Sequence, residues 1–202
     1  MRLFAINLHR SRDRRAALLS WIEQPGLPWE IFEAVDASAH RRETLPWTND
    51  HWGANLWPGP VGCFLSHARV LERVLDYGIE WAVVVEDDVR LLPDRAEAVR
   101  DLALPAGFDL IYLHEMRVPG LRSTVIASDG ALHRVRPAML TTGAYIVSRG
   151  FAGRFCAEFK RVEMPIDHLY QRASRAGGAR FYELAEPMFR IDGRFGSTSR
   201  TP

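Results

Sequence analysis

The carboxylate triplet Glu86–Asp88 follows directly on the apolar run Trp81–Val85. The run is typical of a strand buried on both faces, and ligands gather at the carboxyl ends of strands in open α/β sheets. Because side chains alternate along an extended chain, Glu86 and Asp88 are predicted to point to one side and Asp87 to the other. Two carboxylates on one side suit a hard divalent cation such as Mn²⁺ or Mg²⁺, which would in turn bind a diphosphate. A solvated acidic turn after a strand is the alternative interpretation.

Glycine and proline residues precede a second candidate, the segment Gly62–His67, where an apolar pattern with helical spacing begins. Backbone N–H groups at a helix N-terminus attract anions. Ser66 and His67 could therefore face a phosphate or a sugar hydroxyl, and His67 could also bind the metal ion. The alternative is a capping or core histidine, which needs no ligand.

Basic residues gather behind the first apolar segment of the chain. Asn7 ends that segment, and arginines follow at positions 10, 12, 14 and 15. A guanidinium group binds phosphate through a planar fork of donors, so this stretch is predicted to cradle the phosphates or base of a nucleotide. A solvated basic helix face is the alternative interpretation.

A lone carboxylate, Asp167, lies near the start of a predicted helix and two residues after Pro165. A carboxylate aimed into a cleft can take a proton from a hydroxyl group, which makes Asp167 a candidate general base. Acidic residues also stabilise a helix N-terminus through the helix dipole, and this structural role stays open.

The candidate residues are positioned by strands and helices whose patterns alternate along the chain. This alternation predicts an α/β fold. Strands are predicted over Arg2–Leu8, Trp29–Val35, Trp81–Val85, Phe108–His114, Ala144–Val147 and Phe181–Leu184, with a hairpin over Thr124–Arg136 that turns at Asp129-Gly130. Helices are predicted over Ser11–Ile22, Gly62–Tyr77, Arg95–Ala103, Gly150–Lys160 and Ile166–Ala176.

Two segments lack a regular pattern. Ser38–Pro60 is predicted to be a long loop. Its Trp47, Trp52 and Trp57 could stack on the apolar face of a sugar, or they could be buried and pin the loop. The tail over residues 191–202 is rich in Gly, Ser and Arg and is predicted to be mobile.

The chain has 202 residues, of which 26 are basic and 25 acidic, and a net charge of +1. The length predicts one domain over residues 1–202, and the balanced charge argues against a nucleic-acid-binding protein. Cys63 and Cys156 are too few and too far apart to predict a disulfide framework or a zinc site. We find no signal-peptide pattern and no long apolar run, so we expect a cytoplasmic protein with at most peripheral contact at the inner face of the membrane.

One detail of the composition is unusual, because 25 of the 26 basic residues are Arg and only Lys160 is Lys. A genome biased toward Arg codons explains this, and so would arginines that bind phosphate.

Taken together, these segments resemble glycosyltransferase family 25, which includes bacterial lipooligosaccharide galactosyl- and glucosyltransferases and is related to the collagen galactosyltransferases. The resemblance spans residues 2–190, and its most specific part is the pair formed by Gly-Cys-x-x-Ser-His and the later Glu-Asp-Asp. The matching stretches are Ile6–Leu8 with Arg12–Arg15, Ala34–Asp36, Gly62–His67, Val83–Asp88, Thr142–Val147 and Pro165–Asp167.

The resemblance implies a single-domain GT-A-type fold, an α/β architecture with a Rossmann-like mixed sheet flanked by helices. It places the nucleotide-sugar and metal half at about residues 2–115 and the acceptor half at about residues 116–190. The implied reaction moves a hexose, galactose or glucose, from a UDP-hexose to an acceptor hydroxyl with inversion, assisted by Mn²⁺ or Mg²⁺. The acceptor would be a glycan, a lipid-linked sugar or another hydroxyl compound, in lipooligosaccharide or other surface glycan biosynthesis.

The resemblance also implies roles for individual residues. Glu86 and Asp88 would hold the cation, Asp87 would approach the ribose or the sugar of the donor, and Asp167 would be the base. The donor site would be lined by Asn7, Leu8, Arg12, Arg15, Ala34, Asp36, Ser66 and His67. Ala37 stands where the family usually has Gly, which is a departure at the turn after Asp36.

Two other functions fit the same residues. A protein that binds glycans or nucleotide sugars without turnover would keep the fold, although intact Glu86, Asp88 and Asp167 disfavour it. A metal-dependent phosphohydrolase would use Glu86, Asp88 and His67, and would release phosphate without needing an acceptor.

Overall fold

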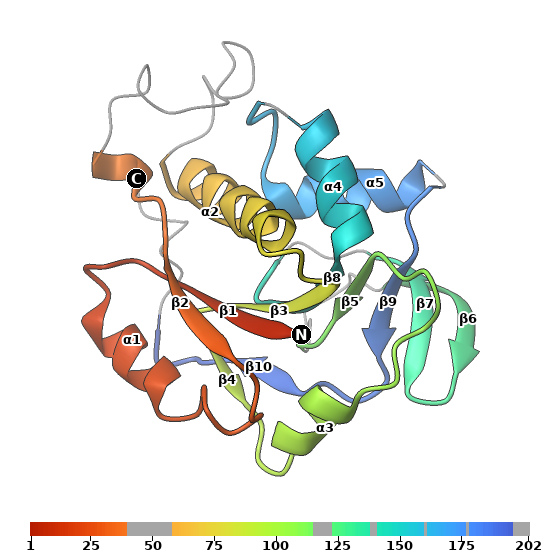
Figure 1. The fold of residues 1–202 in the computed structure, drawn as a ribbon, viewed down its shortest axis with the longest axis horizontal. Coiled ribbons are helices and arrows are strands. Elements are labelled where there is room, and N and C mark those ends of the chain that lie inside the picture. Colours follow the sequence, from red (N-terminus) through yellow and green to blue (C-terminus); the bar gives the residue numbers. More distant parts are fainter. Residues whose placement is uncertain (40–57, 115–122, 138–140, 160, 177, 196–202) are drawn as a thin grey trace.

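The computed structural model describes residues 1–39, 58–114, 123–137, 141–159, 161–176 and 178–195. Within them the strands form an eight-stranded mixed sheet and a two-stranded ribbon (Figure 1). The large sheet has the order β2-β1-β3-β8-β5-β9-β7-β6. Its strands are β1 (Arg2–Asn7), β2 (Trp29–Glu33), β3 (Trp81–Glu86), β5 (Leu110–Tyr112), β6 (Thr124–Asp129), β7 (Leu132–Arg136), β8 (Ala144–Ser148) and β9 (Phe181–Leu184). The ribbon pairs β4 (Val89–Leu91) with β10 (Phe189–Ile191).

Helices cover both faces of the large sheet (Figure 1). Those described are α1 (Arg12–Leu19), α2 (Pro58–Asp76), α3 (Ala96–Asp101), α4 (Arg149–Glu158) and α5 (Ile166–Arg175), with the short 3₁₀ helix η1 (Ala37–Ala39). One apolar core joins α2, α4 and α5 to one face, and a second joins α1, α3 and the ribbon to the other. In β3, Val84 faces the first core and Val83 the second, which explains why this strand reads as an unbroken apolar run.

The topology brings several chain segments to one edge of the sheet. β1 pairs in parallel with β2 and β3, so the carboxyl ends of these three strands meet. β8 runs antiparallel between β3 and β5, and its amino end therefore lies at the same edge. The backbone N–H of Glu86 donates to the carbonyl of Gly143 at 2.8 Å. Residues predicted as the donor and acceptor halves thus share one sheet, and chemistry from both can meet at this edge.

The predicted mixed α/β sheet with flanking helices is confirmed, and so is the hairpin, where Gly130 has a φ of +57° in the turn between β6 and β7. Two short strands, β4 and β10, were not predicted. α2 begins at Pro58 rather than at Gly62, because proline is tolerated in the first turn of a helix, where no backbone donor is needed. Trp47, Trp52 and Trp57 lie outside the described residues.

Residues 196–202 of the predicted mobile tail lie outside the described residues, and the described residues 191–195 contact other parts of the chain. Ile191 belongs to β10, and the backbone N–H of Asp192 donates to the carbonyl of Asp88 at 2.6 Å. Arg14 lies over the ring of Phe195, 5.5 Å from its centroid. This end of the described chain therefore closes over the carboxyl end of β3. None of the described helices is both long and apolar enough to cross a membrane.

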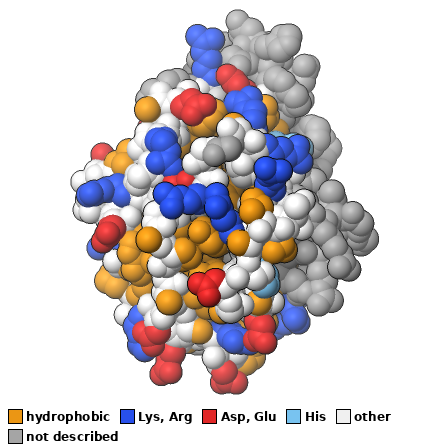
Figure 2. Space-filling view, turned by 90° about the vertical axis from the view of Figure 1, so that its right-hand side faces the viewer, with side chains coloured by type: hydrophobic (Ala, Val, Ile, Leu, Met, Phe, Trp, Pro, Cys, Tyr) orange, Lys and Arg blue, Asp and Glu red, His pale blue; other side chains and the backbone are white. Residues whose placement is uncertain are grey.

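Charge is unevenly distributed over the surface. Figure 2 shows Lys and Arg side chains gathered in the upper half of the face on the right of Figure 1, bordering an apolar area below them. The near-neutral total charge therefore hides local concentrations of cationic side chains.

Candidate active site

The three carboxylates after β3 lie in different surroundings. Glu86 accepts a hydrogen bond from the Thr142 hydroxyl at 2.6 Å, and its Oε1 lies 3.2 Å from Nε2 of His67. Asp87 is buried and accepts hydrogen bonds from Asn7 Nδ2 at 2.8 Å and from Arg14 Nη1 at 2.7 Å. Asp87 and Glu86 thus face different partners, as the alternation of an extended chain predicts.

Asp88 differs from its neighbours because its Oδ1 is buried and has no hydrogen-bond partner among the described residues. Burial and the nearby charge of Glu86 raise the pKa of the Asp88 carboxyl to about 7. Burial also raises the pKa of Glu86, but its contacts with His67 and Thr142 outweigh this effect and hold the pKa below its usual value. Two half-buried carboxylates that raise each other's energy, one of them with a buried and unsatisfied oxygen, are the arrangement that a bound cation relieves. The residues present therefore fit a divalent cation held by Asp88 and Glu86.

His67 is the link between α2 and this edge. Its ring is 1% exposed and lies stacked on Tyr145, with Nδ1 2.8 Å from the Tyr145 hydroxyl. Its other nitrogen faces Glu86. Both ring nitrogens of His67 therefore have a polar partner, and one of these partners is a carboxylate of the site. A histidine that only fills the core would not need that second contact.

Ser66 lies beside His67 on α2 but faces the end of β2. Its hydroxyl accepts from the backbone N–H of Val35 at 2.8 Å and donates to the carbonyl of Gly62 at 2.6 Å. A Cβ atom added to Gly62 would lie 2.5 Å from the carbonyl oxygen of Val35. The backbone at the start of α2 thus lies directly against the backbone of the segment after β2. The two hydrogen bonds of Ser66 stabilise this contact. The predicted contact of Ser66 with the donor stays a prediction.

The predicted nucleotide residues cluster at the ends of β1 and β2. Asn7 is 1% exposed, and its Oδ1 is buried without a hydrogen-bond partner among the described residues. The backbone N–H of Ala34 donates to the Asn7 carbonyl at 2.9 Å, and Leu8 is half-buried beside it. Asp36 forms an ion pair with Arg10 and accepts from the Ser38 hydroxyl at 2.5 Å.

A small cavity of about 260 Å³ lies in this corner, lined by residues Arg10–Arg14 and Phe195. Arg12 is exposed at its wall. Arg15 is exposed too but does not line the cavity, so the structure separates it from the rest of the predicted set. A pocket with guanidinium walls beside an unsatisfied amide oxygen can receive a nucleotide's phosphate and a hydrogen-bond donor.

Asp167 lies in the first turn of α5 and is half-buried. Its Oδ1 accepts from the backbone N–H of His168 at 2.8 Å. Burial raises the pKa of the Asp167 carboxyl, and the charge of Glu86 raises it further, so both carboxylates belong to one electrostatic site. A carboxylate with a raised pKa is better poised to take a proton from a hydroxyl group.

A family model described as glycosyltransferase family 25 (LPS biosynthesis protein) matches residues 1–170. The chain belongs to glycosyltransferase family 25. A Bos taurus protein named probable inactive glycosyltransferase 25 family member 3 is 33% identical over 183 residues, covering 82% of this chain and 30% of the relative. Procollagen galactosyltransferase 2 of Mus musculus is 38% identical over 97 residues, covering 44% of this chain and 16% of the relative.

The family 25 chain thus spans at most about a third of the length of these relatives. Among solved structures, a glycosyltransferase involved in the glycosylation of the major capsid of PBCV-1 superposes with a TM-score of 0.52 at 9% identity. That match covers 98% of this chain and 95% of the other, and it shows a shared GT-A-like fold.

Three residues at the site of this family 25 chain received no role from the sequence. Thr142 binds Glu86, and Cys63 Sγ lies 4.0 Å from the Thr142 hydroxyl. His114 follows β5 and is buried, and its Nε2 lacks a hydrogen-bond partner among the described residues. Burial lowers the pKa of its imidazole, which therefore faces the site as a neutral group. The position of His114 at the carboxyl end of a buried strand is the signal that could have identified it.

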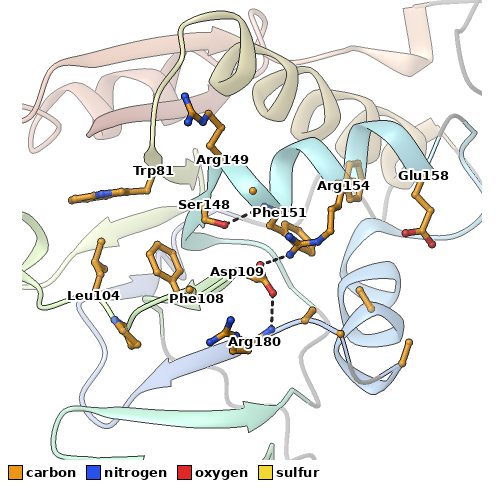
Figure 3. Close-up of a pocket in the computed structure, with 18 of the residues that line it drawn as sticks. Trp81, Leu104, Phe108, Asp109, Ser148, Arg149, Phe151, Arg154, Glu158 and Arg180 are labelled. Carbon is orange, nitrogen blue, oxygen red and sulfur yellow. Dashed lines mark hydrogen bonds and ion pairs between the residues drawn. The ribbon is translucent and has the colours of Figure 1, made fainter.

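A second cavity of the family 25 chain, of about 1080 Å³, lies elsewhere (Figure 3). It is lined by Trp81, which begins β3, by Phe108 and Asp109 before β5, and by Arg149 and Arg154 of α4. β3 separates it from Glu86 by the length of the strand, about 17 Å at 3.3 Å per residue. This cavity therefore belongs to the opposite edge of the sheet from the carboxylates.

Proposed function

We propose that this chain is a glycosyltransferase domain that moves a hexose, galactose or glucose, from a UDP-hexose to an acceptor hydroxyl with inversion. One observation carries the proposal: the unsatisfied carboxylate of Asp88 lies beside Glu86 at the carboxyl end of β3, where this fold binds its nucleotide. The name of the mouse relative, a procollagen galactosyltransferase, supports galactose as the sugar. The family description supports a surface glycan such as lipooligosaccharide as the acceptor.

In this proposal Asp88 and Glu86 hold Mn²⁺ or Mg²⁺. When bound, the cation supplies positive charge that offsets the negative charge of the departing diphosphate. Thr142 and His67 fix the Glu86 carboxylate in place through their hydrogen bonds. Arg12 contributes a guanidinium group to the phosphate pocket, and the free Oδ1 of Asn7 accepts a hydrogen bond from the nucleotide.

Asp167 receives the proton of the acceptor hydroxyl as its oxygen attacks the anomeric carbon. A single displacement of this kind inverts the configuration at that carbon, because the nucleophile enters opposite the departing UDP. Both carboxylate oxygens of the adjacent Asp87 accept hydrogen bonds, one from Asn7 and one from Arg14. These bonds connect β1 and the start of α1 to the end of β3. The proposed contribution of Asp87 is to set the position of Asn7 beside the donor.

UDP release measured across a panel of nucleotide sugars, with Mn²⁺ or Mg²⁺, tests the proposal. We expect release from a UDP-hexose that falls about 100-fold or more in Asp88→Asn, because charge stabilisation of several kcal/mol is lost. The matched control is Asp76→Asn, an exposed carboxylate at the end of α2, which should keep full activity. Release that survives Asp88→Asn and needs no metal would refute the proposal. Phosphate release without an acceptor would favour the phosphohydrolase instead.

A second candidate, binding of a nucleotide sugar without turnover, is favoured by the name of the cattle relative, which describes it as inactive. Calorimetry with UDP and Mn²⁺ separates the two. Binding that Asp88→Asn abolishes, without turnover of any nucleotide sugar, would support the second candidate. In an active enzyme, Asp167→Asn should lower kcat about 100-fold or more and leave the Kd for UDP unchanged.

A further inference from the structure

The thiol of Cys63, the imidazole of His67 and the carboxylate of Glu86 lie together at the edge of the candidate site. The proposed transfer reaction gives the Cys63 thiol no role. Cys63 and His67 lie four residues apart on α2, so their side chains share one face of the helix. Glu86 approaches that face from the end of β3. Cys63 Sγ, a ring nitrogen of His67 and a carboxylate oxygen of Glu86 all lie within 4.8 Å of one another.

The distances fit a tetrahedral cation. Sulfur, nitrogen and oxygen ligands lie about 2.0 to 2.3 Å from Zn²⁺, which places neighbouring ligand atoms about 3.3 to 3.6 Å apart. Nε2 of His67 and Oε1 of Glu86 already lie 3.2 Å apart. Cys63 Sγ lies 4.0 Å from the hydroxyl of Thr142, which itself binds Glu86. Completing the ligand set requires the Cys63 side chain to bring its Sγ to bonding distance of the same cation as the other two donors, all three of which lie within 4.8 Å of one another.

The ligands are also oriented from behind, as in protein metal sites. A histidine that binds a metal through one nitrogen usually forms a hydrogen bond with the other. His67 has this arrangement, with Nδ1 2.8 Å from the Tyr145 hydroxyl, which lies 3.4 Å from the hydroxyl of Tyr170. Thr142 holds Glu86 in the same way. His67 and Glu86 therefore need little reorganisation when a cation enters.

The chemistry of the donors selects the cation. We propose that Cys63, His67 and Glu86 form a site for a borderline-soft divalent cation, Zn²⁺, beside the hard-cation position at Asp88. A thiolate and an imidazole favour Zn²⁺, whereas carboxylates favour Mn²⁺ and Mg²⁺. Three protein ligands leave the fourth position open to water. On binding, the sulfur–metal bond forms as the Cys63 thiol releases its proton to the buffer.

The two positions share Glu86, so occupation of one affects the other. Zn²⁺ on Cys63, His67 and Glu86 removes a ligand from the hard cation at Asp88. Zn²⁺ should therefore weaken Mn²⁺ binding, and the effect should disappear in a variant that lacks the thiol. The zinc site itself does not depend on the proposed transfer reaction.

Titration of the purified, chelator-stripped chain with Co²⁺ tests the proposal without an activity assay. We expect a thiolate-to-cobalt charge-transfer band in the near ultraviolet that saturates at one equivalent and is displaced by Zn²⁺. Cys63→Ser should lose the band and weaken Zn²⁺ binding about 10-fold or more. The matched control is Cys156→Ser, since Cys156 is a buried cysteine of α4 outside the site. It should keep the band, and so should Asp88→Asn.

Absence of the band at saturating Co²⁺, or its persistence in Cys63→Ser, would overturn the proposal. If Cys63→Ser fails to fold, alkylation of the unmodified chain gives the same answer. Zn²⁺ should then slow iodoacetamide labelling of Cys63, located by peptide mass spectrometry, and Mg²⁺ should not. Equal labelling with and without Zn²⁺ would refute the site. Because Asp88→Asn removes the proposed transfer activity but keeps the band, failure of either proposal is recognised separately.

Discussion

Two carboxylates, one near each end of β3, have opposite surroundings. At the amino end, Asp109 is 5% exposed, but its side chain accepts a hydrogen bond from the backbone N–H of Arg180 at 2.7 Å and forms an ion pair with Arg154 (Figure 3). At the carboxyl end, Asp88 keeps an oxygen that no described residue satisfies. An unsatisfied buried polar group costs free energy unless a ligand restores its partner. The difference separates a carboxylate that stabilises the fold from one available to a ligand.

The same contrast holds between the cavities. The large cavity at the amino end has about four times the volume of the small one, yet the polar groups around Asp109 have partners within the chain. The small cavity at the carboxyl end lies in the corner that holds the free Oδ1 of Asn7. Of the five buried side-chain atoms without a hydrogen-bond partner among the described residues, three belong to Asn7, Asp88 and His114 at this edge of the sheet. These three atoms therefore indicate the candidate site better than cavity volume does.

The largest effect is expected at the amino end. Asp109→Ala should lower the free energy of unfolding by about 3 kcal/mol, because the part-buried backbone N–H of Arg180 loses its acceptor and a cavity is left at the buried position 109. Urea unfolding measures the change, and Asp76→Ala is the exposed control. A loss below about 0.5 kcal/mol would show that the two ends do not differ in this respect.

An intermediate effect is expected where α2 meets the carboxyl end. Gly62→Ala should cost about 2 kcal/mol, because its Cβ would lie 2.5 Å from the rigid carbonyl of Val35. The matched control is Gly153→Ala in α4, where the nearest atom outside its own helix backbone, Leu75 Cδ2, is 3.8 Å away. That control should gain up to about 1 kcal/mol from helix propensity. Thermal and urea unfolding of both variants check the prediction, and equal costs would contradict it.

Much of the fold, and the position of the acidic triplet, could be predicted from the sequence. Apolar runs and turn residues identified the strands of the large sheet and most helices, because those patterns reflect burial within one segment. The triplet Glu86–Asp88 was recognised for the same reason, since it directly follows such a run.

The pairing of the carboxylates could not be predicted, because it depends on distant segments. Asp87 is satisfied by Asn7 and Arg14, and Glu86 by Thr142, which lies 56 residues later. β4 and β10 were missed because each has three residues and gains its stability from the other. The ribbon nevertheless matters, since Asp192, just after β10, packs on Asp88.

The smallest effect concerns Asp88 itself and gives the most direct comparison with Asp109. In the chelator-treated protein the pKa of Asp88 is about 7, above its value of about 3.9 in an unfolded chain. Below both values the carboxyl is protonated in both states and costs nothing. As pH rises from about 4 to 7 the unfolded chain loses the proton first, so the native state loses stability. The difference between the two pKa values corresponds to about 4 kcal/mol, but solvent screens the half-buried Asp88 and reduces this effect. Asp88→Asn should therefore be about 1 to 2 kcal/mol more stable than the unmodified chain at pH 8 and no more stable at pH 4, measured by urea unfolding in chelator. Asp76→Asn should show no such gain.

Added Mn²⁺ should remove the difference in stability between Asp88→Asn and the unmodified chain at pH 8, because the cation stabilises only the ionised carboxylate. An equal gain in stability at pH 4 and pH 8 would show that the ionised Asp88 carboxylate does not destabilise the cation-free protein, and would contradict the prediction.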